Sequence, residues 1–189
     1  MGVRTSFHRA SSADTLENKE NLSYVIGVAI GDGNLSNPNG RTVRLRVTCA
    51  TQYPNLIRQI KKSIEKVFPH NKVSLVKRKE TYLDVSCYSN KWESILGWRA
   101  SGGSKYKQSV SVPQWIKENK RYSMKCLQGL LVTDGSLYLD RGYRMINFTT
   151  VIPRLAQDVR EMIVNLWFSS RIYRLKTKGK DKYVIKNSN

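Results

Sequence analysis

Two apolar stretches of the chain end in the same dipeptide, Asp-Gly, and this repeat constrains the fold more than any other feature. The stretches cover residues 22–33 and 125–135. Small residues recur in them four positions apart: Gly27 and Gly31 in the first, Gly129 and Thr133 in the second. Because positions four apart share one face of a helix, each stretch predicts a helix with a small face that a second helix can approach closely. We therefore expect the two helices to pack against each other.

The acid of each repeat lies in the last turn of its predicted helix. A carboxylate there opposes the helix dipole and is disfavoured by about 0.3–1 kcal/mol. If the small faces pack together, Asp32 and Asp134 converge, and two close carboxylates repel each other unless a cation lies between them. Divalent cations such as Mg²⁺ bind oxygen ligands of this kind, so the pair predicts a metal site. The glycine after each acid, Gly33 or Gly135, suits a left-handed helix C-cap.

Residues 25–33 and 127–135 resemble the two signature motifs of the LAGLIDADG homing endonucleases. The second motif is the closer match, since the first has Val25 where Leu is usual and Ile30 where the family often has an acid. The resemblance extends over about 22–186. It implies a monomeric protein that carries both motifs in one chain and has pseudo-twofold symmetry.

The charge of the chain indicates a polyanionic partner. Lys and Arg number 33 against 14 Asp and Glu, which gives a net charge of +19, and nucleic acid is the commonest partner of such a protein. No apolar run reaches the length of a membrane span. The three cysteines, Cys49, Cys87 and Cys126, lack metal-ligand spacing and indicate buried free thiols in a reducing compartment, either a bacterial or archaeal cytoplasm or an organelle.

Four segments follow from the pattern along the chain. Residues 1–20 are polar and predict a mobile tail, 21–96 a first half, 97–120 a linking segment with a helix, and 121–189 a second half. Asn21 or Ser23 is the expected N-cap of the first motif helix. Further helices are expected over 54–68, 90–96 and 153–168, and strands over 35–36, 41–50, 72–78, 82–88, 143–150, 171–176 and 182–186.

Each half therefore has the order helix, hairpin, helix, hairpin. This predicts an α+β fold with two antiparallel sheets side by side and the motif helices at the interface. The resemblance implies that the sheets form a saddle over the DNA major groove. The side chains expected to face the groove are Arg44, Arg46, Thr48, Lys72, Ser74, Asn147, Thr149, Tyr173 and Arg174; those expected to contact phosphates at hairpin tips are Lys77, Lys79, Lys176, Lys178 and Lys180.

The linking segment is expected to complete the site. Its Gly-x-Lys-x-Lys run resembles the family segment that brings a basic residue near the metals, which implies Lys105 as the first choice and Lys107 as the second. The resemblance also implies that the carbonyl groups of Gly31 and Thr133 bind metal beside the two acids. Mg²⁺ would then be the cofactor, and Ca²⁺ could substitute without cleavage. Cys49 and Thr150 would stand at the ends of the long strands, where the family often orders a water molecule.

The resemblance implies an intron-encoded endonuclease that makes metal-dependent double-strand breaks in a long, asymmetric DNA target, and the basic charge and the two acids agree with it. Three alternatives remain. One is an RNA maturase that binds its host intron RNA on the same fold, and another is a transcription regulator with a degenerate copy of the fold. The third is a basic ribosome-associated protein. The two retained acids favour cleavage, because a protein that only binds nucleic acid does not need them.

Overall fold

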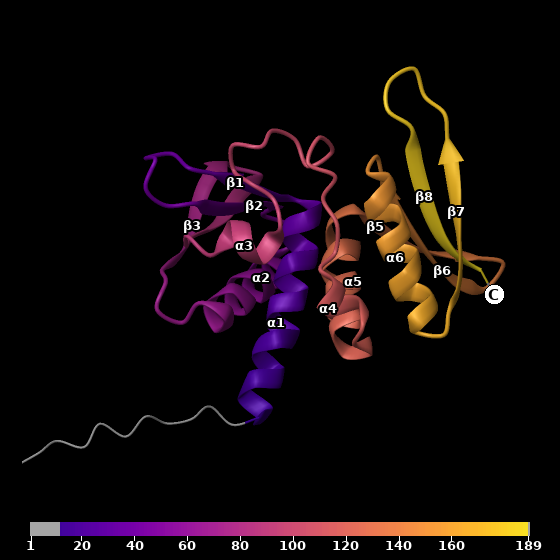
Figure 1. Ribbon diagram of the computed structural model, residues 1–189, viewed down its shortest axis with the longest axis horizontal. Coiled ribbons are helices and arrows are strands. Elements are labelled where there is room, and N and C mark those ends of the chain that lie inside the picture. The colour runs from indigo at the N-terminus through magenta and orange to yellow at the C-terminus, as the bar shows by residue number, and fades with distance from the viewer. Residues whose placement is uncertain (1–11, 189) are drawn as a thin grey trace, which may run out of the picture.

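Two halves of the same make-up lie on either side of a central pair of helices (Figure 1). The structure is a computed structural model and describes residues 12–188. The first half contains α1 (Ser12–Gly31), β1 (Gly33–Ser36), β2 (Arg44–Ala50), α2 (Pro54–Val67), β3 (Val73–Lys79), β4 (Tyr82–Tyr88) and the short α3 (Trp92–Leu96). The second contains α5 (Lys120–Asp134), β5 (Gly135–Asp140), β6 (Tyr143–Thr150), α6 (Pro153–Asn165), β7 (Ser169–Leu175) and β8 (Lys182–Ser188), and α4 (Gln114–Lys117) precedes it.

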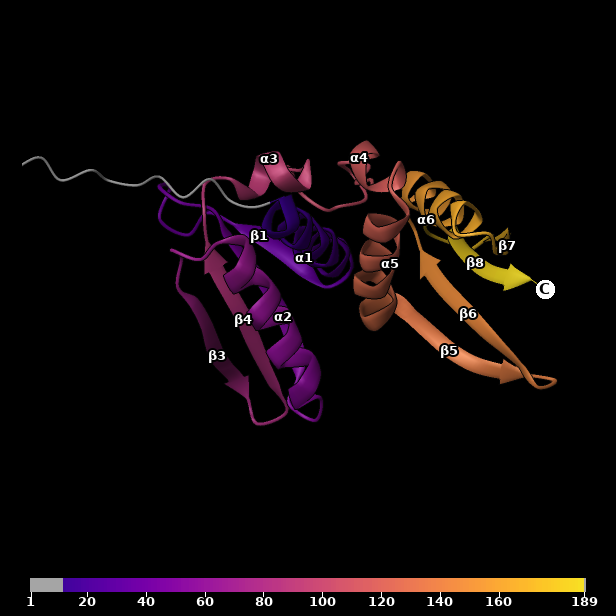
Figure 2. The ribbon, with the colours of Figure 1, turned by 90° about the horizontal axis from the view of Figure 1, so that it is seen from below.

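The two halves carry antiparallel sheets of identical topology. The strand order is β1-β2-β4-β3 in the first sheet and β5-β6-β8-β7 in the second. The registers also correspond, because Gly33 pairs with Val47 and Gly135 with Phe148. Seen from below in Figure 2, β3–β4 and β5–β6 diverge from the central helices. The predicted duplication of a helix-hairpin-helix-hairpin unit in an α+β fold is confirmed.

Helices α1 and α5 approach so closely that their backbones touch through the predicted small faces. A Cβ atom on Gly27 would overlap the carbonyl oxygen of Cys126, and one on Gly129 would lie 2.7 Å from the backbone nitrogen of Val28. Neither contact leaves room for a side chain. The prediction that the motif helices form the interface between the halves is therefore confirmed.

The prediction of left-handed C-caps at Gly33 and Gly135 is wrong. Both glycines start strands instead, and Gly135 has an extended backbone with φ −99° and ψ 164°. They are needed for space: a Cβ on Gly33 would lie 2.5 Å from the carbonyl oxygen of Ala29, and one on Gly135 would lie 2.6 Å from the Cα of Leu131. The chain therefore leaves each motif helix directly into a strand.

Helix α1 begins at Ser12, so the expected tail over 1–20 is wrong for 12–20, and residues 1–11 lie outside the described part. Asn21 and Ser23 are not N-caps, because their side chains donate to the carbonyl groups of Glu17 and Lys19 one turn earlier. The polar first turns of the helix extend beyond the apolar motif. This is why the sequence pattern placed its start too late.

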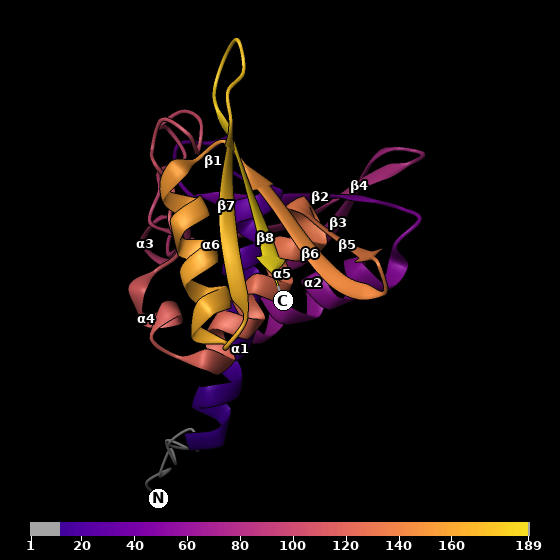
Figure 3. The same cartoon turned by 90° about the vertical axis from the view of Figure 1, so that its right-hand side faces the viewer.

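The core lies between each sheet and its helices. Leu45, Val47 and Val85 of the first sheet are fully buried beneath α1 and α2, and Phe148 and Ile185 occupy the same place in the second sheet. Figure 3 shows α6 along one side of that second sheet. The three cysteines are buried and free, as predicted. Within residues 12–188, no helix has both the length and the apolar character needed to span a bilayer.

Candidate active site

The two motif acids converge where the central helices end. Asp134 is the last residue of α5, and Asp32 follows α1 directly, with its backbone nitrogen bonded to Val28 at 3.0 Å. Partial desolvation raises the pKa of Asp32, against the lowering effect of Lys105. Partial desolvation, followed by the negative charge of Asp32, raises the pKa of Asp134. The helix packing therefore brings the two carboxylates within electrostatic range of each other, at a place open to solvent.

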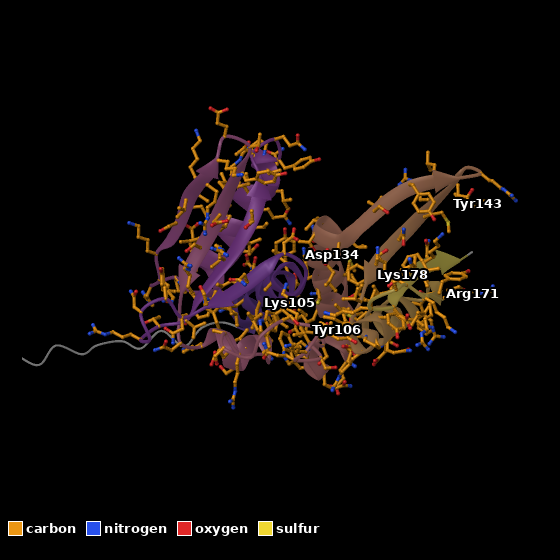
Figure 4. The ribbon with its side chains drawn as sticks, turned by 90° about the horizontal axis from the view of Figure 1, so that it is seen from above. Lys105, Tyr106, Asp134, Tyr143, Arg171 and Lys178 are labelled. Carbon is orange, nitrogen blue, oxygen red and sulfur yellow. The ribbon has the colours of Figure 1, made fainter. Side chains whose placement is uncertain are left out.

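Lys105 joins these acids from the linking segment (Figure 4). Its Nζ donates to the carbonyl oxygens of Ile30 at 2.8 Å and Gly31 at 2.5 Å. Burial lowers its pKa to about 8, although the charges of Asp134 and Asp32 act in the opposite direction. Lys107 is exposed, so the structure brings the first-choice lysine, and not the second, to the acids.

The segment that carries Lys105 is braced by side chains. The Gln108 amide accepts from the backbone nitrogen of Arg99 at 2.8 Å and donates to the carbonyl oxygens of Arg99 and Gly103. The backbone nitrogen of Ala100 donates to Glu93 at 2.7 Å. These bonds give the loop a defined conformation and fix it to Glu93 of α3 in the first half.

The other end of the segment is fixed to the second half by a buried acid. Asp158 on α6 is 4% exposed, and it accepts from the backbone nitrogen of Val112 at 2.8 Å and from Lys117 Nζ at 2.9 Å. Lys117 also reaches Glu161 at 2.9 Å. Burial disfavours the charged form of Lys117, but the hydrogen bonds that it donates to both acids outweigh this effect and raise the pKa of the lysine. The linking segment is therefore anchored at both ends.

The site has the donor chemistry of a divalent cation site. Its groups are two carboxylates and the carbonyl oxygens of helix ends, which lack partners within the helix; all are the hard oxygen ligands that Mg²⁺ and Ca²⁺ prefer. The ammonium group of Lys105 already lies against the Gly31 carbonyl, so the place favours positive charge. Among residues 12–188, no three side chains of His, Cys, Asp or Glu cluster, so a cation here would rely on carbonyl, water or substrate oxygens as well.

Cys49 and Thr150 occupy corresponding places, two residues after Val47 and Phe148. Cys49 is 6% exposed, and burial, followed by the charges of Asp32 and Asp84, raises the pKa of its thiol to about 11. The thiol therefore stays neutral at physiological pH. Thr150 accepts from the backbone nitrogen of Ile152 at 3.2 Å, so its hydroxyl group caps a turn.

We call the sheet faces turned away from the helices the groove faces. On the first sheet, Arg44, Arg46 and Thr48 lie on this face, opposite buried Leu45 and Val47. Ser74 belongs to it as well, because it pairs with Ser86, which pairs with Arg46. Lys72 precedes β3 and is exposed.

The groove face of the first sheet holds a network that the sequence pattern missed. Asp84 of β4 is 2% exposed; it accepts from Thr48 at 2.8 Å and from Arg78, and Arg46 Nε lies 3.8 Å from its Oδ2. Burial opposes ionisation, but the bonds from Arg78 and Thr48 and the two positive charges hold the pKa of Asp84 below its usual range. Strand alternation already indicates that Asp84 shares the face of Thr48. It cannot show which head groups meet.

On the second sheet, Asn147, Thr149 and Tyr173 share the groove face, since Tyr173 pairs with Val184 and Val184 with Thr149. Arg174 is the next residue of the strand and lies on the other side, where it binds the partly buried Asp181 at 2.6 Å. The expectation that both Tyr173 and Arg174 face the groove is therefore wrong for Arg174, because successive strand residues point to opposite faces.

The tip lysines divide into two groups. Those of β3 and the β7–β8 connection are exposed, as expected: Lys77, Lys79, Lys176 and Lys178. Lys180 is exposed as well, but its Nζ also lies 4.0 Å from the centre of the ring of Tyr106, the residue next to Lys105 in the chain. The tip of the last hairpin thus contacts the loop of the active site.

Sequence comparison assigns both halves to the same kind of domain. Residues 121–189 match the LAGLIDADG-like domain, and residues 21–95 match the WhiA LAGLIDADG-like domain. Among curated proteins, no sequence matches the chain.

Solved structures share the whole fold. A single-site variant of the homing endonuclease I-DmoI, in complex with its target DNA and Mg, is 20% identical over 92% of this chain and 91% of its own, with a TM-score of 0.67. I-DmoI in complex with DNA and Ca is 18% identical over 91% and 84%, with a TM-score of 0.64.

A second group of structures is similar over the same length. Full-length DUF199/WhiA from Thermotoga maritima is 15% identical over 89% of this chain and 51% of its own, with a TM-score of 0.57. These identities show a shared fold, and the two domain matches cover one motif each. The chain therefore belongs to the LAGLIDADG family, in the form that carries both motifs in a single chain.

Proposed function

We propose that this protein is a site-specific endonuclease that makes metal-dependent double-strand breaks in a long, non-palindromic DNA target. The convergence of Asp32, Asp134 and Lys105 at the ends of α1 and α5 carries this proposal. A protein that only binds DNA gains nothing from two carboxylates held close together, since their repulsion is a cost. The homing endonuclease structures that share the fold contain target DNA and divalent ions, which supports the same conclusion.

In the proposed mechanism, Asp32, Asp134 and the carbonyl oxygens of Gly31 and Thr133 would hold the cation. When bound there, a divalent cation supplies Lewis-acid activation of the attacking water and of the leaving oxygen. Lys105 stabilises the negative charge that develops on the scissile phosphate, because its ammonium group lies beside both acids. Its bonds to Ile30 and Gly31 aim this group at the place where the two halves meet.

The groove faces would supply recognition. Arginine can donate two bonds to guanine and asparagine two bonds to adenine, so Arg44, Arg46 and Asn147 are suited to contact base edges. The two faces differ at corresponding places, for example Arg46 against Asn147, each next to the paired positions Val47 and Phe148. A target without twofold symmetry follows from this difference.

A cleavage selection tests the proposal. A plasmid library with a long randomised insert is incubated with the protein and Mg²⁺, and the sequences of linearised plasmids are determined. We expect one asymmetric sequence to be cut in both strands by the wild type. Asp32→Asn and Asp134→Asn should each still bind that sequence without cutting it. If either variant cuts at the wild-type rate, the shared site is not the cleavage centre.

DNA binding without cleavage is the second candidate, because the first half matches the WhiA LAGLIDADG-like domain and the family includes members that do not cleave. A regulator of this kind would select a DNA sequence in binding, would leave it intact with Mg²⁺, and would bind it equally after Asp134→Asn. The same selection, run for binding and for cleavage, separates the two candidates.

A further inference from the structure

The groove face of the first sheet contains an acid in a protein with a net charge of +19. Asp84 pairs in register with Thr48 on the neighbouring strand, and its side chain is buried beneath two arginines. A negative charge on a surface that is to meet DNA opposes binding unless it has another task. The contacts of this carboxylate indicate what the task is.

Each oxygen of Asp84 has a defined partner. Oδ1 accepts from the Thr48 hydroxyl group at 2.8 Å. Oδ2 accepts from Nε of Arg78, and Nε of Arg46 lies 3.8 Å from the same oxygen. Both arginines thus approach the acid with Nε, the nitrogen nearest to the chain. The two terminal nitrogens of each arginine form the end of its guanidinium fork.

Arg78 lies beside an irregularity of the sheet. The pairing of β3 with β4 shifts between Lys77 and Lys79, where Lys77 faces Leu83 and Lys79 faces Tyr82. Arg78 is the residue between them, and strand alternation from Ser74 through Val76 places it on the groove face. From there its side chain reaches Asp84.

We propose that Asp84 is a positioning residue that aligns Arg46 and Arg78 for contact with two guanines in one half of the target. This inference rests on the proposed DNA-binding function. The end of a guanidinium fork can donate to O6 and N7 of guanine together, and a fork fixed from behind loses less freedom on binding than a free one. Asp84 itself does not contact a base, because its oxygens are occupied and it is 2% exposed.

The second half has no counterpart of this acid. Thr149 corresponds to Thr48, and its partner on β8 is Val184, an aliphatic residue. Asn147 corresponds to Arg46 and pairs with Lys186. The guanine requirement set by Asp84 should therefore occur in one half-site only.

Binding selection from a randomised double-stranded DNA library, with a chelator present so that no cleavage occurs, tests the proposal. The wild type is expected to prefer guanine at two positions of one half-site. Asp84→Asn should lower the preference for guanine over adenine by about tenfold at both positions, and Arg78→Ala should do so at one of them. At that one position the double variant should lose little more than Arg78→Ala alone, because both changes remove the same arrangement.

Asp181→Asn is the matched control, since Asp181 binds Arg174 in a pair outside the groove face. It should leave every base preference unchanged. If Asp84→Asn weakens or strengthens binding to all sequences equally, the acid has no role in recognition and the proposal is overturned. If that variant does not fold, Arg78→Ala decides, because the Arg78 side chain is 47% exposed and its loss should not disturb the core; unchanged preferences would overturn the proposal.

The outcome is separate from that of the cleavage test. The inference is supported if the wild type binds selectively and the Asp84→Asn variant has lost the guanine preference, whether or not the wild type cuts DNA with Mg²⁺. If the wild type cuts a defined site and Asp84→Asn keeps the same guanine preference, the inference is overturned. The proposed nuclease function is then unaffected.

Discussion

Nζ of Lys105, in the linking segment, lies 2.5 Å from the carbonyl oxygen of Gly31, the last residue of α1. The lysine therefore contacts one of the oxygens assigned to the metal, beside both acids. It can neutralise the acids while no metal is present, and it can stabilise a phosphate when DNA is bound.

Lys105→Met should lower the rate of cleavage by about 100- to 1000-fold, the usual effect of removing one group that stabilises charge in the transition state. DNA binding should change little. Single-turnover cleavage at saturating protein measures the effect, and Lys107→Met is the control, because that lysine is exposed and does not reach the acids. Equal losses in both variants would mean that the loop acts only through its overall charge.

Asp134→Asn should raise the melting temperature of the metal-free protein at pH 7. The pKa of Asp134 is raised in the folded state, so the folded protein favours the protonated acid more than the unfolded chain does. The stability that goes with the protonated form is present below the ordinary pKa of about 4 and is lost as the pH rises through the folded pKa. Melting curves in a chelator should therefore show a gap between variant and wild type that closes towards about pH 4. A gap that widens there would contradict the assigned shift.

Gly129→Ala should destabilise the protein, because a Cβ there would lie 2.7 Å from the Val28 backbone nitrogen and would overlap the Tyr24 carbonyl oxygen. Overpacking of this kind costs about 1–3 kcal/mol or more, and each kcal/mol lowers the melting temperature of a protein of this size by about 2–4 °C. Gly179→Ala is the control, with no atom within 4 Å of its Cβ. Thermal melts of both variants give the comparison. Equal melting temperatures would show that the helices separate easily.

Asp158→Ala should cost about 3–5 kcal/mol of unfolding free energy, since it removes the buried acid that binds both Lys117 and the backbone nitrogen of Val112. Glu161→Ala removes the other acid bound to the same lysine, but Glu161 is 44% exposed, so its loss should cost less than about 1 kcal/mol. Denaturant unfolding measures both values. If both variants lose a similar unfolding free energy, the burial of Asp158 does not make its bond to Lys117 stronger than that of Glu161.

Lys178→Ala should weaken binding to all DNA sequences alike, because this lysine lies exposed at a hairpin tip. The slope of log affinity against log salt should fall by about one unit. Arg46→Ala should instead alter base preference. Binding measured at several salt concentrations, on the selected target and on unrelated DNA, separates the two effects; a change in preference in Lys178→Ala would contradict the division.

The sequence predicted the duplicated fold and the central acids, because the repeat of Gly27 and Asp32 in Gly129 and Asp134 is local and unambiguous. It could not predict the conformation after each acid. Gly33 and Gly135 are required by contacts with Ala29 and Leu131, and a helix-stop glycine looks the same in sequence.

Strand alternation predicted the facing of Arg44 and Arg46 correctly but failed at a strand edge, where Arg174 and Tyr173 were assigned to one face. It did not indicate the contact of Arg78 with Asp84, although alternation from Ser74 places both side chains on one face. Asp84 is contacted by long arginine side chains from the neighbouring strands. The alternation of residues along a strand does not show where the charged ends of such side chains lie.

The distribution of the active-site residues along the chain has a consequence for protein synthesis. A nascent chain that has left the ribosome as far as residue 96 has the strands of the first sheet but lacks Lys105 and Asp134. At about 5–20 residues per second, the remaining residues take on the order of 5–20 s to add. On the proposed mechanism, an incomplete translation product could associate with the host chromosome without breaking it, and damage would require a ribosome that reaches the second motif.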